Sequence, residues 1–509
     1  MIDTKALREK ILDLAIRGKL VPQDPNDEPA SVLLERIRTQ KQQRVNEGKL
    51  KPKDIKNDTI IFKGEDNLHY EQFQDGTVKC IEDEIPFDLP KGWAWARLRT
   101  IVFDLPYGTS KKSSSNGKIA VLRMGNLQNG EIDYSDLVYS SDEEDIKKYF
   151  LIKGDLLFNR TNSIELVGKT SIYRGDIPAI YAGYLIRIRS SLNSGYLNTV
   201  MNSSYAREYC ASVRTDAVNQ SNINSTKLGD FLVPVPSRLE QKRIDEKISE
   251  SIKVIDIVEQ EKLDLQLIVT NAKSKILDFA IRGKLVPQDS NDEPASVLLE
   301  RIRAEKEKLI KQGKIKRVQK ESVIFKGEDN SYYRDIPKNW ELCSILNIAE
   351  VELGKTLDKG KNTGKFYPYL RSINIKWNDI DLSDLKQMRF ESEEIERYSV
   401  QKNDLLICEG GDVGRCCVWK DEPILYQNAL HRVRFYGSCN PYFFMYTLML
   451  LESIGYLKSI SNGVTIKHLT KSVLSTIQFP LPPLAEQKRI VEAIESAFAQ
   501  LDHIINCIS

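Results

Sequence analysis

Two loops of the chain carry residue types that can read nucleic-acid bases. Asn159-Arg-Thr-Asn-Ser163 and Leu166-Val-Gly-Lys-Thr170 place hydrogen-bond donors and small residues in one predicted hairpin, and Glu409-Gly-Gly-Asp-Val-Gly-Arg415 does the same with a different set. Arginine can bind guanine through two hydrogen bonds, asparagine can bind adenine in the same way, and carboxylates can accept from cytosine amino groups. Glycine lets the backbone approach a phosphate. A plain surface hairpin has a similar composition, so a base contact and an ordinary loop are both open at this point.

Catalytic motifs are incomplete in this sequence. Gly168-Lys-Thr170 and Gly354-Lys-Thr356 resemble the end of a phosphate-binding P-loop, but Ser163 and Ala349 stand where its first glycine belongs. Asn440-Pro-Tyr-Phe443 resembles the Asn-Pro-Pro-aromatic motif of amino-methyltransferases without its second proline, and it predicts a turn that leads into a buried helix. Neither GxGxxG nor GxSxG occurs. We therefore expect no catalytic residue in this chain and no cofactor bound by it.

Histidine and cysteine are too few, or too poorly spaced, to predict a metal centre. The chain has 4 His and 8 Cys, with no Cys-x-x-Cys pair. Cys408, Cys416, Cys417 and His431 form one loose cluster, and adjacent cysteines seldom ligate one zinc ion well. We therefore expect no metal site. This use of cysteine favours the reducing cytoplasm as the location.

Length and charge limit the class of protein. At ~100–200 residues per domain, 509 residues predict roughly three domains, or two with connecting elements. The 74 Lys and Arg nearly balance the 72 Asp and Glu, which excludes a protein that coats nucleic acid by bulk charge but not one with a local basic face. The longest largely apolar run, 442–451, is far shorter than the ~20 residues of a membrane-spanning helix. The N-terminus has interleaved charges and is not a signal peptide, so we expect no membrane partner.

The strongest pattern in the sequence is an internal repeat. Residues 10–38 read KILDLAIRGKLVPQDPNDEPASVLLERIR, and residues 275–303 read KILDFAIRGKLVPQDSNDEPASVLLERIR. The two segments are identical at 27 of 29 positions, which excludes chance similarity. Weaker matches continue the repeat through each copy: Ile61–Asn67 with Ile324–Asn330, Leu89–Trp93 with Ile336–Trp340, Arg123–Leu127 with Arg371–Ile375, Ile146–Leu157 with Ile395–Leu406, and Glu240–Ile244 with Glu486–Ile490.

The two copies differ most in about 93–236 and 340–480. An uneven drift after a recent duplication explains this contrast, and so does a division of labour in which identical parts meet identical partners while variable parts recognise different things. Both blocks contain short β-type runs between Gly, Asn, Ser and Asp, which predicts a mixed α/β (α+β) fold of strands and polar loops. The clearest of these runs are Ile119–Leu122, Leu156–Phe158, Leu185–Ile188 and Leu405–Ile407.

Long helices are predicted between the variable blocks. Residues 238–282 contain no Gly or Pro, and their apolar stripe predicts an amphipathic helix of roughly 65–70 Å, at 1.5 Å per residue, that ends at Gly283. The N-terminal segment 4–17 matches the second half of this helix, and the C-terminal segment 484–509 matches its first half, so the repeat is circular. We infer that the central helix packs antiparallel to both terminal helices, around a pseudo-two-fold axis, and holds two domains at a fixed separation.

A further helix is predicted after each copy of the near-identical segment. Pro29 and Pro294 fall at a first-turn position, ahead of the shared ASVLLERIR. Lys49–Lys56 and Lys314–Lys320 then follow as basic, loop-like stretches. Such runs are typical of solvated surface, and an arm that contacts a protein or a phosphate is the alternative.

Together, these repeated phrases resemble the specificity subunit of type I restriction–modification enzymes. The phrases are the two Ala-Ile-Arg-Gly-Lys-Leu-Val-Pro-Gln-Asp segments from Ala15 and Ala280, the Glu-Gln-Lys-Arg-Ile segments after Val233–Pro236 and Phe479–Pro482, and the Pro-x-x-Trp entrance to each variable block. They cover nearly the whole chain and are specific only in combination. The resemblance implies two tandem target-recognition domains that alternate with two helical conserved regions.

The resemblance also implies a function and a set of partners. Such subunits are not enzymes: each recognition domain reads one half of a bipartite, asymmetric target in double-stranded DNA, and the helical spacer sets the gap. Two modification subunits dock on the near-identical regions and methylate adenine with S-adenosylmethionine, and restriction subunits join them to translocate DNA with ATP and Mg²⁺ and to cleave it. A methyltransferase or nuclease with unrecognised motifs, or a protein-binding scaffold, is the alternative interpretation.

The resemblance further divides this sequence and implies its site residues. The divisions are an N-terminal helical arm (1–48), an entry segment (49–92), a first recognition domain (93–236), a central helical spacer and arm (237–313), a second entry segment (314–339), a second recognition domain (340–483) and a C-terminal helix (484–509). Matched positions pair Arg123 and Asn126 with Arg371 and Asn374, and Arg160 and Lys169 with Arg415. The implied DNA-binding residues are Arg123, Asn126, Arg160, Asn162, Lys169, Arg371, Asn374, Arg415, Lys467 and His468.

Overall fold

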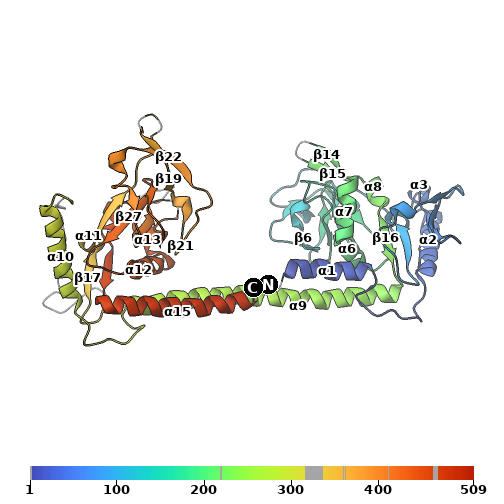
Figure 1. The fold of residues 1–509 in the computed structure, drawn as a ribbon. Helices are drawn as coiled ribbons and strands as arrows, with labels where there is room; N and C mark the ends of the chain where they lie inside the picture. Colours follow the sequence, from blue (N-terminus) through green and yellow to red (C-terminus); the bar gives the residue numbers. More distant parts are fainter. Residues whose placement is uncertain are drawn as a thin grey trace. The chain divides into compact units, whose positions relative to one another are not determined.

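The computed structural model describes residues 3–217, 220–315, 336–358, 360, 363–410, 412–461 and 468–508. The chain divides into two compact units, Ile2–Glu261 and Lys262–Ser509 (Figure 1). The boundary falls inside α9 (Arg238–Ile281), a single helix of 44 residues. The long helix predicted from the stretch without Gly or Pro is therefore confirmed.

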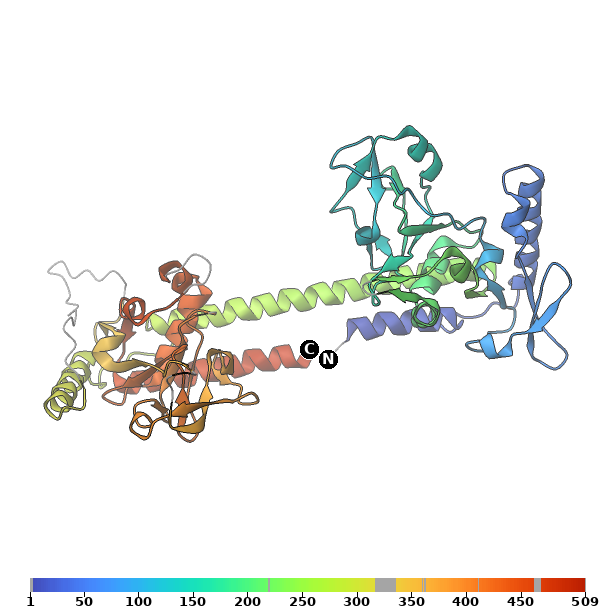
Figure 2. The ribbon, with the colours of Figure 1, turned by 90° about the horizontal axis from the view of Figure 1, so that it is seen from above.

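In the first unit, α1 (Thr4–Ile16) packs antiparallel to the first half of α9. Arg8 of α1 forms an ion pair with Glu259 at 3.0 Å, while Gln23, beyond the end of α1, donates to Glu240 at the start of α9 at 2.5 Å. Residue numbers thus rise along one helix as they fall along the other. Figures 1 and 2 show the two helices side by side.

The second unit repeats this arrangement with α15 (Leu484–Ile508) and the second half of α9. Lys273 of α9 forms an ion pair with Asp502 at 2.5 Å, and Gln288 donates to Glu486, near the start of α15, at 2.5 Å. Both terminal helices therefore lie antiparallel to α9, as the circular repeat predicts.

A left-handed glycine follows α1 and recurs after α9. Gly18 and Gly283 have φ angles of 64° and 65°, a backbone region that glycine enters without steric cost. A Cβ atom at Gly18 would lie 2.5 Å from Pro90, and one at Gly283 would lie 2.4 Å from Pro337. The glycine of the shared Ile-Arg-Gly-Lys-Leu sequence is thus required for two reasons: the turn needs a positive φ angle, and the proline at the entrance to each variable block leaves no room for a side chain.

The first unit surrounds these helices with five small sheets, ordered β1-β2-β3, β13-β9-β11-β7-β6, β12-β5-β8, β10-β15-β14 and β16-β4. Its other helices are α2 (Ala30–Asn46), α3 (Pro52–Ile55), α4 (Leu98–Ile101), α5 (Glu143–Tyr149), α6 (Ser194–Asn202), α7 (Ser204–Val213) and α8 (Ser225–Gly229). Its strands are β1 (Ile60–Lys63), β2 (His69–Gln72), β3 (Val78–Cys80), β4 (Ala94–Arg97), β5 (Ile119–Leu122), β6 (Leu127–Gln128), β7 (Glu131–Ile132), β8 (Val138–Ser140), β9 (Leu156–Asn159), β10 (Thr161–Asn162), β11 (Thr170–Ile172), β12 (Ala179–Tyr181), β13 (Leu185–Ile188), β14 (Thr215–Ala217), β15 (Gln220–Asn222) and β16 (Leu232–Val235).

The described part of the second unit has four sheets, ordered β18-β27-β24-β25, β22-β19-β26-β23, β17-β28 and β20-β21. Its other helices are α10 (Ala295–Lys311), α11 (Ile345–Ile348), α12 (Pro441–Ser453), α13 (Tyr456–Ile460) and α14 (Lys471–Leu474). Its strands are β17 (Glu341–Ser344), β18 (Ala349–Leu353), β19 (Lys365–Leu370), β20 (Ile375–Lys376), β21 (Asp379–Ile380), β22 (Lys386–Phe390), β23 (Ser399–Val400), β24 (Leu405–Cys408), β25 (Cys416–Val418), β26 (Ile424–Tyr426), β27 (Leu430–Phe435) and β28 (Gln478–Leu481).

The two units share the central part of their strand topology. In each, the first and last strands of the variable block pair antiparallel, β4 with β16 and β17 with β28. A central strand, β9 or β24, pairs antiparallel with a neighbour on either side. All four of the β-type runs named above form strands. The mixed fold of strands and helices predicted for the variable blocks is therefore confirmed.

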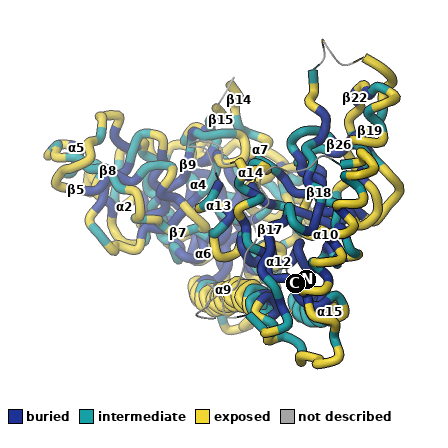
Figure 3. Tube along the Cα trace, turned by 90° about the vertical axis from the view of Figure 1, so that its left-hand side faces the viewer, coloured by how far each residue is buried: buried dark blue, intermediate teal, exposed yellow. Residues whose placement is uncertain are grey.

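Each variable block has its own buried core. Every residue of β5, β9 and β24 is buried, and Figure 3 shows β5 and β9 in dark blue. The largely apolar run at 442–451 lies in α12, whose side chains fill the core of the second unit, as predicted. No helix in the described part of the chain combines the length and apolar character needed to cross a membrane.

Two local predictions were wrong. The basic stretch 49–56 contains a short helix, α3, rather than only a loop, because Pro52 starts a turn and Asp54 caps it. Pro29 and Pro294 are N-cap residues of α2 and α10, one position ahead of the first turn. The first helical N–H group then donates outside its helix: that of Ala30 bonds the carbonyl of Gly92 at 2.8 Å.

Candidate functional site

The loop after each central strand closes with the same backbone hydrogen bond. The N–H of Asn159, at the end of β9, donates to the carbonyl of Lys169 at 2.8 Å, and the N–H of Cys408, at the end of β24, donates to the carbonyl of Arg415 at 2.8 Å. Lys169 and Arg415 are therefore structural equivalents. The backbone hydrogen bonds therefore agree with the match between Lys169 and Arg415 that the sequence predicted, and a cation occupies this position in both units.

The first residue of each loop is also equivalent, and here the predicted match was wrong. The carbonyl of Arg160 accepts from the N–H of Ile223 at 2.9 Å, and the carbonyl of Glu409 accepts from the N–H of Leu469 at 2.7 Å. Arg160 therefore corresponds to Glu409 and has no arginine counterpart. The predicted match with Arg415 failed because the first loop is longer, with residues 160–168 in the place of 409–414.

Arg160 is held loosely beside an aromatic ring. Its guanidinium carbon lies 4.5 Å from the centre of the Tyr107 ring, and its terminal nitrogens reach the carbonyl of Gly183 and the side chain of Asn222 at a long 3.4 Å. Its Nε atom has no partner within the described residues. Because Nε is itself buried, it is the terminal nitrogens, held only by long bonds, that are available for a further acceptor, while stacking orients the guanidinium.

The other loop side chains differ in how firmly they are bound. Lys169 reaches Gln128 only at 3.5 Å, and Asn162 accepts from the neighbouring backbone N–H. Arg415 donates to Asp412 at 2.8 Å and to the carbonyl of Ser372 at 2.9 Å. Lys169 is therefore the more available of the two equivalent cations.

Asn126 and Asn374 form the same buried turn in the two units. Each side-chain oxygen accepts from the N–H of the residue three positions earlier, at 2.8 Å from Arg123 and 2.9 Å from Arg371. Each amide nitrogen donates to two backbone carbonyls of the following loop. Both side chains are at least 97% buried, so the geometry supports a structural role in place of the base contact expected from the sequence.

The arginines that precede these turns are more accessible. Arg123 donates to Asp136 and Arg371 donates to Asp384, both at 2.8 Å. The Arg371 side chain also bonds the carbonyl of Asp384 at 2.8 Å. Because the acidic partners are exposed, these ion pairs can open at little cost when a competing anion approaches.

The segment that precedes the last strand lies against each loop. Asn222 pairs with Thr161 in the first unit, and the exposed His468 forms a bridge with Gly410 in the second. Asn222 and His468 are therefore structurally equivalent. Lys467 lies outside the described residues.

Two residues of this surface were missed as site candidates. Glu409 belongs to the second loop, but only Arg415 of that loop was predicted as a site residue. Tyr107 lies far from both loops in the sequence. The available signal for Glu409 was a charged residue directly after a buried strand. No comparable signal singled out Tyr107, because the contact with Arg160 joins residues that are distant along the chain.

The clustered residues Cys408, Cys416, Cys417 and His431 are all buried in the core. Burial raises the pKa of the Cys408 thiol to about 11, and it lowers the pKa of His431, whose ring nitrogen contacts the carbonyl of Leu469 at 2.8 Å. Among the residues that the structure describes, no three His, Cys, Asp or Glu side chains gather where they could hold a metal ion.

A buried polar contact, here called the clasp, recurs unchanged in both units. In the first clasp, Glu240 accepts from the Trp93 indole at 2.9 Å and from Gln23 at 2.5 Å. In the second clasp, Glu486 accepts from Trp340 at 2.9 Å and Gln288 at 2.5 Å. Burial raises the pKa of both glutamates, so these hydrogen bonds are what keep the carboxylates inside the protein.

The clasp explains most of the Glu-Gln-Lys-Arg-Ile phrase. After the glutamate, Gln241 donates to the carbonyl of Pro236 at 3.0 Å, Arg243 pairs with Asp27 at 2.6 Å, and the isoleucine is buried. The lysines, Lys242 and Lys488, are instead 69% and 76% exposed. Each lysine sits on the outer face of a helix start that is otherwise fixed by internal contacts.

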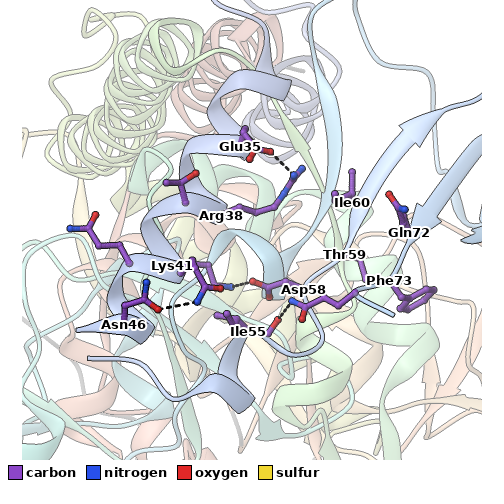
Figure 4. Close-up of a pocket in the computed structure, with 14 residues that line it drawn as sticks. Glu35, Arg38, Lys41, Asn46, Ile55, Asp58, Thr59, Ile60, Gln72 and Phe73 are labelled. Carbon is purple, nitrogen blue, oxygen red and sulfur yellow. Dashed lines mark hydrogen bonds and ion pairs between the residues drawn. The ribbon is translucent and has the colours of Figure 1, made fainter. Parts of the chain in front are cut away.

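A cavity of 490 Å³ opens between α2 and the sheet that holds β1 (Figure 4). Lys41, buried at its edge, pairs with Asp58 at 2.6 Å and donates to the carbonyl of Arg99 at 2.8 Å. Burial lowers the pKa of Lys41 and raises that of Asp58 to about 6. In the second unit Lys306 is buried at the matching position and donates to the carbonyl of Leu346 at 3.0 Å. The lysine therefore anchors α2 or α10 to its unit.

The comparisons with known proteins agree with this duplicated architecture. Residues 337–506 match the family model for the type I restriction modification DNA specificity domain. Two relatives are similar along nearly the whole chain, as described below. The chain is thus similar to type I restriction–modification specificity subunits, which confirms the resemblance seen in its repeated phrases.

Each match also covers most of the length of the similar protein. The EcoAI specificity subunit of Escherichia coli is 29% identical, over 96% of this chain and 88% of the relative. The EcoEI specificity subunit of Escherichia coli is 26% identical, over 98% and 90%. A solved chain from a study of complex assembly in the type I system has the same fold, with a TM-score of 0.54 and 15% identity over 83% of this chain and 94% of that one.

Proposed function

We propose that this chain is the non-catalytic subunit that selects the DNA target of a type I restriction–modification complex. Residues 93–236 and 340–483 each read one half of a bipartite, asymmetric sequence. The observation that carries the proposal is one backbone frame used twice, with different side chains at the end of its central strand: Arg160 in one copy and Glu409 in the other. Two equal readers would suit a symmetric target, whereas two unequal readers suit an asymmetric one.

The near-identical regions fit two identical partners. Both clasps have the same hydrogen bonds, and the exposed Lys242 and Lys488 stand at equivalent positions beside them. Equal surfaces on one chain can bind two copies of the same protein. We assign them to two modification subunits, which would supply S-adenosylmethionine, while restriction subunits would supply the ATP- and Mg²⁺-dependent steps.

The continuous α9 supports the role of a spacer. A helix of 44 residues spans about 66 Å at 1.5 Å per residue, and each of its halves is packed against a terminal helix. In this proposal the length of α9 sets the gap between the two half-sites. Within the recognition surface, the candidates for DNA contact include Arg123, Arg160, Lys169, Arg371, Arg415 and His468, whereas Asn126 and Asn374 shape the turns beside them.

The test uses the full chain together with the modification subunits encoded with it. Duplexes selected from a random pool should share two short conserved blocks separated by a fixed gap, and binding should weaken steeply with salt. Alanine at Lys169 should then relax one block and alanine at Arg415 the other.

Three outcomes would overturn the proposal. Selection of no sequence at all would favour a protein-binding scaffold, and methylation of DNA by the chain without partners would favour a methyltransferase. Equal loss of both blocks in both variants would disprove the division between the two domains.

A further inference from the structure

The residue that follows the central strand carries opposite charge in the two units, although its backbone is held in the same way. The N–H of Arg160 donates to the carbonyl of Tyr184 at 3.0 Å, and the N–H of Glu409 donates to the carbonyl of Ala429 at 3.0 Å. Their own carbonyls accept equivalent bonds, as described above. The backbone therefore does not dictate which charge stands here, and the reversal needs another cause.

The residues around Arg160 and Glu409 differ in a way that matches the charge of each side chain. Arg160 has two aromatic neighbours in its frame: Tyr107 beneath the guanidinium, and Tyr184, which is 52% exposed. By the same strand register, Leu353 and Ala429 occupy these two places around Glu409. An arginine is thus provided with a flat platform that a carboxylate does not need.

Glu409 is a half-buried carboxylate without a fixed cation. In the described part of the second unit no lysine or arginine forms an ion pair with it, and His468 lies across the neighbouring bridge. Arg160 likewise has no carboxylate partner among the described residues and makes only long hydrogen bonds to neutral groups. Contacts among the described residues therefore leave the charge of both side chains unneutralised.

A contact with a DNA phosphate cannot explain this position. Phosphates attract cations and repel carboxylates, so a position that met the DNA backbone in both copies would carry a cation in both. Base edges in the major groove present both acceptors and donors, and they accommodate either charge. A position that alternates between arginine and glutamate on an unchanged frame therefore suits the reading of bases.

We propose that Arg160 and Glu409 each read one base through opposite hydrogen-bond polarity. Arg160 donates to O6 and N7 of a guanine in one half-site, and Glu409 accepts from the N4 amino group of a cytosine in the other. The inference rests on the proposed function and adds to it the two determining residues and the bases that they select. Tyr107 is a positioning residue, which limits the orientations of the Arg160 guanidinium.

The experiment repeats the selection from random duplexes with Arg160→Gln and Glu409→Gln variants of the full chain, bound to its modification subunits. Each substitution removes the charge; Glu409→Gln keeps the side-chain length, whereas Arg160→Gln shortens the side chain. Each should change the preference at one base pair, a G·C pair, and the two affected pairs should lie in different half-sites. Affinity for the original duplex should fall roughly 5- to 150-fold, with the slope of affinity against salt almost unchanged.

Two matched variants and one positioning variant complete the design. Arg174 and Glu422 lie beyond the opposite ends of β11 and β25 from the loops, so Arg174→Gln and Glu422→Gln should leave every base preference intact. Tyr107→Leu introduces the residue that the second unit carries at this place. It should weaken the preference at the Arg160 base pair alone.

The outcomes separate this inference from the proposed function. If the wild-type complex selects no bipartite sequence, the proposed function itself fails. If it does select one, but Arg160→Gln lowers affinity for all duplexes alike and flattens the salt slope, Arg160 contacts phosphate and the inference is overturned. Unchanged base preferences in either glutamine variant would overturn it as well.

Discussion

The clasps and the ends of the central strands are two duplicated regions that have diverged to very different degrees. At the clasps, Glu240 and Glu486 make the same two hydrogen bonds at the same lengths. At the strand ends, the backbone bonds around Arg160 and Glu409 are also alike, but the side chains have opposite charge. Buried polar groups that satisfy each other tolerate little change, whereas a residue whose backbone alone is fixed can vary freely.

The largest effect that tests this comparison is expected from removing a clasp. Glu240→Ala should lower the free energy of unfolding of the first unit by about 3 kcal/mol, because it leaves the buried Trp93 indole without its acceptor and also removes the bond from the exposed Gln23 amide. Glu486→Ala should do the same in the second unit. Hydrogen exchange of α9 amides reports which half of the helix is affected.

Lys242→Ala and Lys488→Ala are the controls, since these lysines lie in the same phrase but are exposed. They should change stability by less than about 0.5 kcal/mol. A clearly unequal loss for the two glutamate variants would break the comparison, because it would mean that equal contacts do not have equal energetic weight in the two units.

The sequence predicted the repeated parts of the fold well and the variable surface less well. Apolar periodicity and the absence of Gly and Pro were enough to locate α9, and the near-identity of the two copies predicted equivalent helix ends at Gly18 and Gly283. The equivalence of Arg160 with Glu409 could not be predicted, because the loops differ in length and only long-range backbone bonds fix the register. The burial of Asn126 was missed for a similar reason: an asparagine that closes a turn has the same sequence signature as one that reads a base.

A smaller effect is expected at the ion pair that anchors α2. At neutral pH, Asp58→Asn should destabilise the first unit by about 2 kcal/mol, because it leaves the buried charge of Lys41 without compensation. The pKa of Asp58 is raised to about 6 in the folded protein, above its ordinary 3.8. Protonation of Asp58 therefore favours the folded state, and this contribution is present below pH 4 and lost as the pH rises through 6.

The stability advantage of the wild type over Asp58→Asn should consequently grow as the pH falls from 6 to 4, because only the wild type has a carboxyl that takes up a proton on folding in this range. Chemical denaturation at several pH values measures it, with the exposed Asp83→Asn as control. A difference that stayed constant across this range would show that the charge on Asp58 does not matter to the anchor. The same anchor can be compared in the second unit. Lys41→Met and Lys306→Met remove the matched buried lysine from α2 and α10, and the loss of stability can be measured for each.

The smallest expected effect concerns Arg123 and Arg371, which stand at matched positions and are identical in the two copies. Their exposed ion pairs with Asp136 and Asp384 contribute little, so alanine at either should change stability by less than about 0.5 kcal/mol. If differing residues read bases and identical ones meet the backbone, each alanine should weaken binding to all duplexes alike and reduce the salt slope by about 1, without altering the selected sequence. A base-specific change at either position would contradict that rule, because one identical residue would then be reading sequence in two half-sites that differ. If the salt slope did not change, neither arginine would contact a phosphate, and both would serve only to shape the turns that they form with Asn126 and Asn374.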